Sequence, residues 1–309
     1  MRGTDGTGWG RRRTAAVFAP LLATAVLAAG CQTTGSVIPA HDRDPVVTIA
    51  TADFAEVELV GRIVTSALSR AGYRVTLNSR SGPQDRVVDS VAEGRATFTV
   101  GFTGELMSRY DPSATARSSA DVYAAMTAAL PEGLTAGDAA PAEDAPAYVV
   151  SKNTSDTAGL RRMSDLRGRC GEFALGARRS VLDDAGLSAA VGTGYDCSFA
   201  RREVLPDNPR EVARALQEGR VGIGVVQSTD PVLSLPDMVA LPDDLDVVTA
   251  QNLVPVFAKG SLSEDQLTLV NKVFGELTSE DLQELLRGPE YGTGSPADLG
   301  NYWLDKHGY

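Results

Sequence analysis

Two similar stretches, AEGRATFTV at residues 92–100 and QEGRVGIGV at residues 217–225, set the organisation of this chain. Each is typical of a helix end, a glycine that terminates the helix, and a strand rich in apolar residues. A loop and a further helix are expected after each strand, with Thr103 and Thr229 as candidate helix caps. Two copies of one unit predict two related α/β lobes with mostly parallel sheets.

The segment before the first copy supplies further elements of the same kind. Residues 46–50 predict a buried strand, and residues 59–68 carry apolar side chains at helical spacing. Asp53 and Glu56 have the spacing of a capping box at the start of that helix. A strand at 73–77 would follow, and the alternation of strands and helices indicates an α/β fold.

The N-terminal 31 residues have the pattern of a lipoprotein export signal. Three arginines at 11–13 precede a short run of small and apolar residues, which ends at Cys31. The run is shorter than the roughly 20 residues needed to span a bilayer, which favours a cleaved signal over residues 1–30. Acylated Cys31 would then hold the protein on the outer face of the cell membrane, followed by a flexible tether at 31–44. The alternative is an ordinary signal peptide in which Cys31 is coincidental.

The charge of the chain is acidic. The formal net charge is −11, and it becomes −14 without residues 1–30, which contain four Arg and one Asp. Nucleic acids reward basic patches, so a nucleic-acid partner is not expected. An acidic surface indicates solubility and does not by itself identify a ligand.

Two cysteines remain once Cys31 is assigned to the lipid. Cys170 and Cys197 form an even pair in an oxidising compartment, which predicts a disulfide. A zinc site is not expected, because the only histidines are His41, in the tether, and His307, near the C-terminus. No metal or other cofactor is predicted.

Short motifs follow one another along residues 46–308 in a specific order. They are IATADFAE (49–56), GFTG (101–104), APAED (140–144), MSDL (163–166), STD (228–230), NLVP (252–255), LTSEDL (277–282) and PAD (296–298). In order and spacing, the chain resembles the substrate-binding proteins of glycine betaine/carnitine/choline ABC transporters.

The resemblance implies a two-lobed periplasmic-binding-protein-like fold of type II, with two crossover strands and a ligand cleft between the lobes. The crossovers would lie near 148–150 and 254–257. Lobe one would comprise 45–147 plus 255–309, and lobe two 148–254. The implied partners are a small solute, a membrane permease and an ATPase subunit, because this chain has no Walker-type phosphate loop.

The family typically holds a quaternary ammonium group in a cage of aromatic rings. Here Phe102 stands in place of the usual tyrosine before Thr103, and Pro146 stands where an aromatic or polar residue is expected. Ala213 and Gln251 occupy further cage positions, and some members have lysine at the position of Ala52. The cage is eroded, which weakens the case for glycine betaine more than the case for binding.

Twelve residues are candidates for contact with the ligand. The aromatic ones would face a cation, the acidic ones would attract it, and Arg178 would clamp a carboxylate. The hydroxyl residues lie beside helix N-termini that favour anions. Each also has a structural interpretation, such as core packing or helix capping. The twelve are Thr51, Asp53, Phe54, Phe102, Thr103, Asp144, Tyr148, Arg178, Ser228, Thr229, Asp230 and Asn252.

The sequence leaves three functions open. The first is a solute-binding lipoprotein of an ABC importer, for a glycine betaine/choline-like osmoprotectant or for a non-quaternary solute. The second is an extracytoplasmic enzyme, which the sequence hardly supports, because no histidine lies in a plausible site and no Gly-x-Ser-x-Gly motif occurs. The third is a divergent binding fold that serves as a sensor or scaffold.

Overall fold

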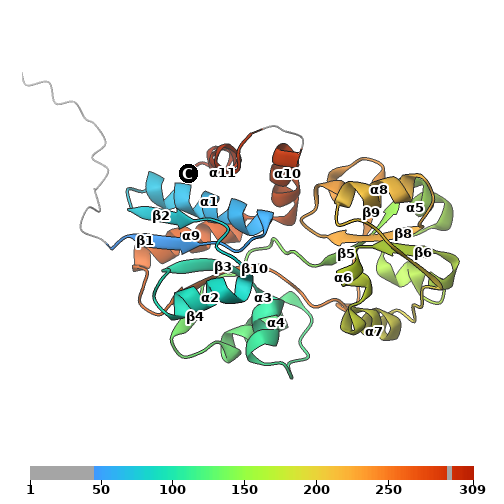
Figure 1. The fold of residues 1–309 in the computed structure, drawn as a ribbon, viewed down its shortest axis with the longest axis horizontal. Coiled ribbons are helices and arrows are strands. Elements are labelled where there is room, and N and C mark those ends of the chain that lie inside the picture. Colours follow the sequence, from blue (N-terminus) through green and yellow to red (C-terminus); the bar gives the residue numbers. More distant parts are fainter. Residues whose placement is uncertain (1–44, 291–293) are drawn as a thin grey trace, which may run out of the picture. The chain divides into compact units, whose positions relative to one another are not determined.

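The computed structural model describes residues 45–290 and 294–309, which form two five-stranded sheets with helices packed against them (Figure 1). The predicted signal at 1–30, the lipidation site Cys31 and the tether that extends to residue 44 lie outside the described residues. Within the described part, no helix is both long and apolar enough to cross a membrane.

The first sheet combines the N-terminal strands with one strand from late in the chain. Its order is β2-β1-β3-β10-β4, in which β1 is parallel to β2 and β3, and β10 is antiparallel to β3 and β4. The strands are β1 (Val47–Ala50), β2 (Val75–Asn78), β3 (Phe98–Phe102), β4 (Leu134–Ala136) and β10 (Leu253–Ala258).

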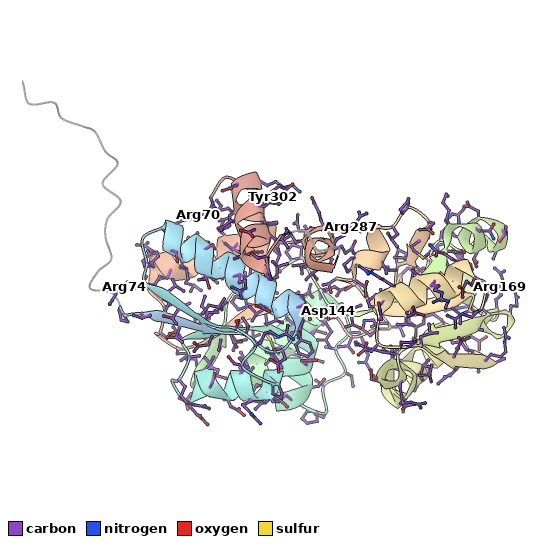
Figure 2. All side chains as sticks on the ribbon, turned by 45° about the horizontal axis from the view of Figure 1, so that its top comes forward. Arg70, Arg74, Asp144, Arg169, Arg287 and Tyr302 are labelled. Atoms are coloured by element: carbon purple, nitrogen blue, oxygen red, sulfur yellow. A yellow bond between two sulfur atoms is a disulfide. The ribbon has the colours of Figure 1, made fainter. Side chains whose placement is uncertain are left out.

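Helices from both ends of the chain share one apolar core with this sheet. Arg70 of α1 donates to Asp305 Oδ1 at 2.6 Å and so ties α1 to the C-terminal helix α11. Arg70 and Tyr302 of α11 are labelled in Figure 2. The helices are α1 (Ala55–Arg70), α2 (Gln84–Ala92), α3 (Thr103–Tyr110), α4 (Ser119–Ala129), α9 (Glu264–Glu276), α10 (Ser279–Glu290) and α11 (Pro296–Lys306).

The second sheet is formed by one continuous part of the chain. Its order is β7-β6-β8-β5-β9, with β6 parallel to β7 and β8, and β5 antiparallel to β8 and β9. The strands are β5 (Pro146–Ser151), β6 (Ala174–Ala177), β7 (Arg201–Val204), β8 (Ile223–Gln227) and β9 (Met238–Leu241).

Apolar side chains cover both faces of the second sheet. Tyr148 and Val150 belong to one buried cluster and Val149 to another, because successive side chains of a strand point to opposite faces. The covering elements are α5 (Lys152–Ala158), α6 (Arg179–Leu182), α7 (Ala185–Gly194), α8 (Pro209–Gln217) and the 3₁₀ helices η1 (Met163–Leu166), η2 (Cys170–Glu172) and η3 (Pro231–Ser234).

The internal repeat is confirmed. Helix α8 begins and ends 125 residues after α2, and β8 begins and ends 125 residues after β3. Strands β3 and β8 also hold the same third position in their sheets. Gly94 and Gly219 follow the two helices with φ angles of 72° and 69°, a left-handed conformation that favours glycine.

The strands expected to connect the lobes are β5 and β10, and each holds the fourth position in its sheet, antiparallel to the third strand. The chain enters the second sheet through β5 and returns to the first through β10. The two-lobed α/β architecture is therefore confirmed, while the exact residue boundaries of the lobes stay a prediction.

The predicted helix caps are wrong in three places. Helix α1 has Phe54 at its N-cap with no side-chain cap, and Asp53 Oδ1 instead accepts from the Gly82 N–H at 3.3 Å. Thr103 is the first residue of α3 and faces the Asn252 backbone. At η3 the cap is Asp230, which accepts from the Val232 N–H at 3.0 Å, whereas the Thr229 hydroxyl donates to Asp144.

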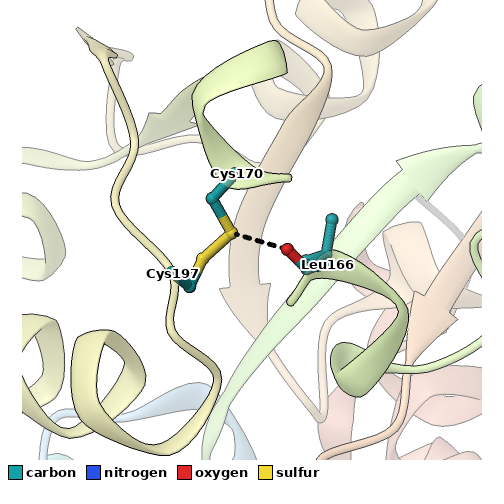
Figure 3. Close-up of a disulfide and its surroundings, with 3 residues drawn as sticks. All are labelled: Leu166, Cys170 and Cys197. Carbon is teal, nitrogen blue, oxygen red and sulfur yellow. Dashed lines mark hydrogen bonds between the residues drawn. A yellow bond between two sulfur atoms is a disulfide. The ribbon is translucent and has the colours of Figure 1, made fainter. Parts of the chain in front are cut away.

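The predicted disulfide between Cys170 and Cys197 is present in the second half of the fold (Figure 3). It joins η2 to the segment after α7, with the two Cα atoms 5.2 Å apart. Both residues are buried, and Cys170 Sγ lies 3.6 Å from the Leu166 carbonyl oxygen. The bond closes a sequence separation of 27 residues, a loop for which chain entropy gives about 3–4 kcal/mol of stabilisation.

We expect the free energy of unfolding of the double variant Cys170→Ala/Cys197→Ala to be about 3–4 kcal/mol lower than that of the parent, because the unfolded chain of the variant is no longer cross-linked. Thermal unfolding followed by circular dichroism measures the difference. Dithiothreitol serves as the control, since it should lower the melting temperature of the parent and leave that of the variant unchanged. Equal melting of the parent and the variant would contradict a stabilising bond.

Candidate functional site

A cavity of about 780 Å³ lies where elements of the two sheets meet. The N-terminal turns of α1 and α3 border it from the first sheet, and the ends of β6 and β8 border it from the second. Ligands of open α/β sheets bind outside the carboxyl ends of the strands, and this cavity has that position. Six of the predicted residues line it, namely Phe54, Phe102, Asp144, Arg178, Thr229 and Asp230.

Two phenylalanine rings form the aromatic part of the cavity. Phe54 caps α1 and is 41% exposed, whereas Phe102 ends β3 and is only 4% exposed. Their ring centroids are 5.9 Å apart with an interplanar angle of 76°, an edge-to-face arrangement. One ring therefore supports the other, and Phe54 provides most of the accessible aromatic surface.

The turn between β3 and α3 is fixed by close backbone contact. A Cβ atom on Gly104 would lie 2.6 Å from the Ala250 carbonyl oxygen, so a side chain at this position would collide with the backbone. The close approach lets the Glu105 N–H donate to Gln251 Oε1 at 3.0 Å. The glycine thus holds α3, with Glu105 in its first turn, against the segment that leads into β10.

Acidic residues gather beside the aromatic pair. Burial, and next the negative charge of Asp144, raise the pKa of Glu56 to about 8, with Arg178 opposing the shift and Glu105 adding to it. Partial desolvation at the cavity, followed by the charges of Asp85 and Asp144, also raises the pKa of Glu105, although its side chain remains exposed. Glu56, Glu105 and Asp144 therefore share one electrostatic environment that favours a positively charged guest.

Asp144 is held by the end of β8. Gln227 Nε2 donates to Asp144 Oδ2 at 2.9 Å, and the Thr229 hydroxyl donates to Oδ1. The Asp144 N–H donates to the Gln251 carbonyl oxygen at 2.9 Å. Asp144 lies on the segment that runs from the first sheet to the second (Figure 2), and these three bonds fix its carboxylate in the cavity.

The two arginines that line the cavity differ in how closely acidic side chains pair with them. Arg80 Nη1 lies 3.5 Å from Glu58 Oε2, and Arg62 also pairs with Glu58 at 2.7 Å. Among the described residues, Arg178, directly after β6, pairs only with Asp207, at 3.6 Å, and the side chain of Asp207 is mostly exposed. Arg178 is therefore the cavity cation best placed to bind an anionic group of a ligand.

The other six predicted residues do not line this cavity. Tyr148 is buried among the apolar residues of the second sheet and stacks on Phe199 at 6.4 Å, because the β5 alternation turns it to that face. Burial raises its pKa. Thr51 is fully buried and accepts from the Arg80 N–H at 3.1 Å, while Asp53 is bound to Gly82.

Thr103, Ser228 and Asn252 connect the crossover segments to the sheets. The Asn252 N–H donates to Thr103 Oγ1 at 3.0 Å, and Asn252 Nδ2 donates to the Ala140 carbonyl oxygen at 3.0 Å. The Ser228 hydroxyl donates to the Glu143 carbonyl oxygen at 2.6 Å and accepts from the Ala145 N–H at 3.0 Å. These side chains position the cavity without lining it.

The cavity also contains residues that the sequence did not single out as ligand contacts. The sequence predicts a capping box for Glu56, and no motif singles out Glu105. Gln227, at the end of β8, contacts Asp144, whereas Gln251, just before the crossover strand β10, contacts Asp144 and the Glu105 backbone. The available signal was position, because each of these residues directly follows or precedes a predicted strand or turn.

Substitution of Glu56 should change how stability depends on pH. The Glu56 carboxyl holds its proton up to about pH 8 in the folded protein and only to its ordinary value of 4.5 when unfolded. The folded state therefore binds the extra proton between these values, and stability falls as pH rises through this window. We expect Glu56→Gln to melt a few degrees above the parent at pH 9 and the difference to shrink toward pH 5.

Thermal melts across pH 5–9 measure this effect, with Glu132→Gln as the matched control. Glu132 is exposed and makes no interaction with another described residue, so its substitution should leave the pH profile of the parent intact. A constant offset between Glu56→Gln and the parent at every pH would contradict the raised pKa.

Solved structures share this architecture. A crystal structure of a glycine betaine/carnitine/choline ABC transporter protein superposes with a TM-score of 0.77 at 18% identity, over 84% of this chain and 98% of the other. Apo YehZ from Escherichia coli gives a TM-score of 0.74 at 18% identity, over 85% and 98%. These similarities establish the two-lobed binding-protein fold.

Sequence comparison gives the family. The carnitine transport binding protein OpuCC of Listeria monocytogenes is 22% identical over 171 residues, which are 52% of this chain and 53% of OpuCC. The chain thus spans about half the length of the curated relatives it matches. The family model described as the substrate-binding domain of an ABC-type glycine betaine transport system matches residues 45–306. The chain therefore belongs to this family of extracytoplasmic binding proteins, which are not enzymes.

Proposed function

We propose that the protein captures a small solute with a positively charged nitrogen group outside the cell membrane and delivers it to a membrane permease. Glycine betaine, choline and carnitine belong to this class of solute. The observation that carries the proposal is that acidic residues, among them Glu56, Glu105 and Asp144, line one cavity of a solute-binding fold together with two phenylalanine rings. Hydrolysis of ATP would fall to a separate subunit.

The cavity offers complementary surfaces to the two ends of such a solute. A cation near Phe54 gains from the face of the ring and from the negative charge of Glu105 and Asp144, and its approach favours the ionised form of Glu56. A carboxylate at the other end of a zwitterion would lie toward Arg178. Solute capture would then draw together groups from the elements of both sheets.

Closure around the solute would rotate the two lobes about the crossover segments. Glu143 and Asn252, one from each crossover, form an isolated antiparallel bridge. Ser228 and Thr103 hold these segments by the hydrogen bonds described above. Two adjacent connections of this kind are suited to a hinge, in which a few residues absorb the change in backbone angles.

We further propose that the mature protein is anchored at the membrane through lipid on Cys31. The support is the sequence of the first 31 residues together with the extracytoplasmic location of the family. A tether up to residue 44 would keep the binding domain close to the permease. Attachment through two or more acyl chains gives lasting membrane association, whereas one chain binds reversibly.

Binding of the solute should stabilise the protein. At 100 times the dissociation constant, we expect about 2.7 kcal/mol of stabilisation, or a rise in melting temperature of a few degrees. Phe54→Ala is expected to weaken binding about tenfold through loss of the ring face. Tyr302→Ala is the matched control, because Tyr302 is 51% exposed and does not line the cavity.

A thermal-shift panel with glycine betaine, choline, carnitine, proline betaine, ectoine, proline and common amino acids identifies the solute, and calorimetry gives the affinities. If none of these compounds or their amine analogues shifts the melting temperature, the proposal that this cavity captures such a solute is refuted. Equal loss of affinity in Phe54→Ala and Tyr302→Ala would refute the role of the ring.

The anchor can be tested separately. We expect Cys31→Ala to move the protein from the membrane fraction to the soluble extracytoplasmic fraction and to abolish incorporation of labelled fatty acid, because the thiol that carries the lipid is gone. Cell fractionation and metabolic labelling measure both effects. The Cys170→Ala/Cys197→Ala variant should remain in the membrane fraction, and membrane retention of Cys31→Ala would refute the anchor.

A further inference from the structure

Among the described residues, the cavity lining offers little aromatic surface for a fully methylated ammonium group. Within the described residues, the lining contains two aromatic side chains, Phe54 and Phe102, and neither tyrosine nor tryptophan. The two rings face each other edge to face, and Phe102 is almost completely buried. Within this described part of the lining, a quaternary ammonium would meet essentially one ring face, while cation–π binding of such groups relies on several.

The carboxylates next to these rings have unused hydrogen-bond acceptors. Among the residues that the structure describes, no other residue donates a hydrogen bond to the carboxylate of Glu56 or of Glu105, and neither carboxylate forms an ion pair. Asp144 is different, since Gln227 and Thr229 occupy one lone pair on each of its oxygens. A carboxylate offers about four acceptor sites, so all three residues can accept more donors.

The chemistry of the guest decides whether these acceptors are satisfied. A quaternary ammonium carries no N–H and would displace water from the carboxylates without replacing its hydrogen bonds. An acceptor left without a partner keeps the full cost of its desolvation. A primary, secondary or tertiary ammonium, or a guanidinium, instead donates charge-assisted hydrogen bonds, which are roughly twice as strong as neutral ones.

The charge of the lining also favours a cation that carries N–H donors. Six of the eight charged residues in the described part of the lining are acidic, and one of the two arginines there, Arg80, is already paired with Glu58. Desolvation of the half-buried Glu56, and next the negative charge of Asp144, raise its pKa and so disfavour its ionised form when no cation is near. The positive charge of a guest stabilises the ionised form of Glu56, and its N–H donors satisfy the carboxylate acceptors. A guest that has both features removes both unfavourable contributions.

We infer that the cavity selects cations that keep at least one N–H, such as primary to tertiary amines or guanidinium compounds, over their fully methylated counterparts. The inference rests on the proposed function, in which this cavity is the solute site. It narrows the substrate class, because the carboxylates of Glu56 and Glu105 take the part that additional aromatic rings would otherwise play.

Matched pairs of solutes that differ by one N-methyl group test the selection. Titration calorimetry on the full chain at pH 8 would compare N,N-dimethylethanolamine with choline, N,N-dimethylglycine with glycine betaine, and norcarnitine with carnitine. In each pair that binds, we expect the compound with the N–H to bind at least tenfold more tightly. Ethanolamine and agmatine extend the series to primary amines and guanidinium.

Substitutions at Glu56, Glu105 and Phe54 test which side chains cause the preference for cations with an N–H. Glu105→Gln and Glu56→Gln should each reduce the affinity ratio within a pair, because a neutral amide accepts a weaker hydrogen bond. Phe54→Ala should instead weaken the methylated member at least as much as its partner and so preserve or increase the ratio. Glu132→Gln is the control that should leave both affinities unchanged, and circular dichroism confirms that each variant is folded.

The outcomes separate this inference from the proposed function. If the methylated member of a pair binds as tightly as its partner or more tightly, the inference fails and the solute-capture proposal stands. An affinity ratio that is unaffected in both glutamate variants also overturns the inference. If no member of any series binds, the proposed function fails together with it.

Discussion

The backbone pairing between the third and fourth strands of each sheet is the constraint on which the cavity depends. In the first sheet, Phe102 at the end of β3 pairs with Leu253 at the start of β10. In the second, Gln227 at the end of β8 pairs with Pro146 at the start of β5. Each crossover strand therefore starts beside the strand end that carries cavity residues. Asp144 and Gln251, just before the crossover strands, are placed in the cavity by the same register.

Much of the fold could be predicted from the sequence, because local patterns and tertiary packing agree there. The helix–glycine–strand repeat and the long apolar face of α1 depend on spacing alone. Strand β7 was missed because its residues, Arg-Arg-Glu-Val, are largely exposed at a sheet edge and have no apolar alternation. Helix α7 was missed because small residues and glycine give it little amphipathic pattern.

The candidate site was harder to predict than the fold, for two physical reasons. Acidic residues in a first helical turn are favoured by the helix dipole wherever they point, so the sequence of α1 could not show that Glu56 reaches a cavity. In the same way, Tyr148 lies on the face of β5 that packs on the second core, and only the sheet partners decide which face that is. Hydroxyl residues such as Thr103 and Ser228 were noticed at the correct positions, but they join backbone segments instead of facing solute.

The bridge between Glu143 and Asn252 has a consequence for how this protein can be rearranged. Partners in an antiparallel bridge have Cα atoms only about 4.5–5.5 Å apart, so the chain leaves the first sheet and returns to it at one point. The whole second sheet is therefore a modular insertion with adjacent ends. Such a module can be removed and the remaining ends joined by a tight turn. It can also be exchanged between relatives as a cassette, and neither change alters the strand order of the first sheet. Exchange of that cassette would replace the cavity residues that it supplies, such as Arg178 and Gln227, while the first sheet is retained.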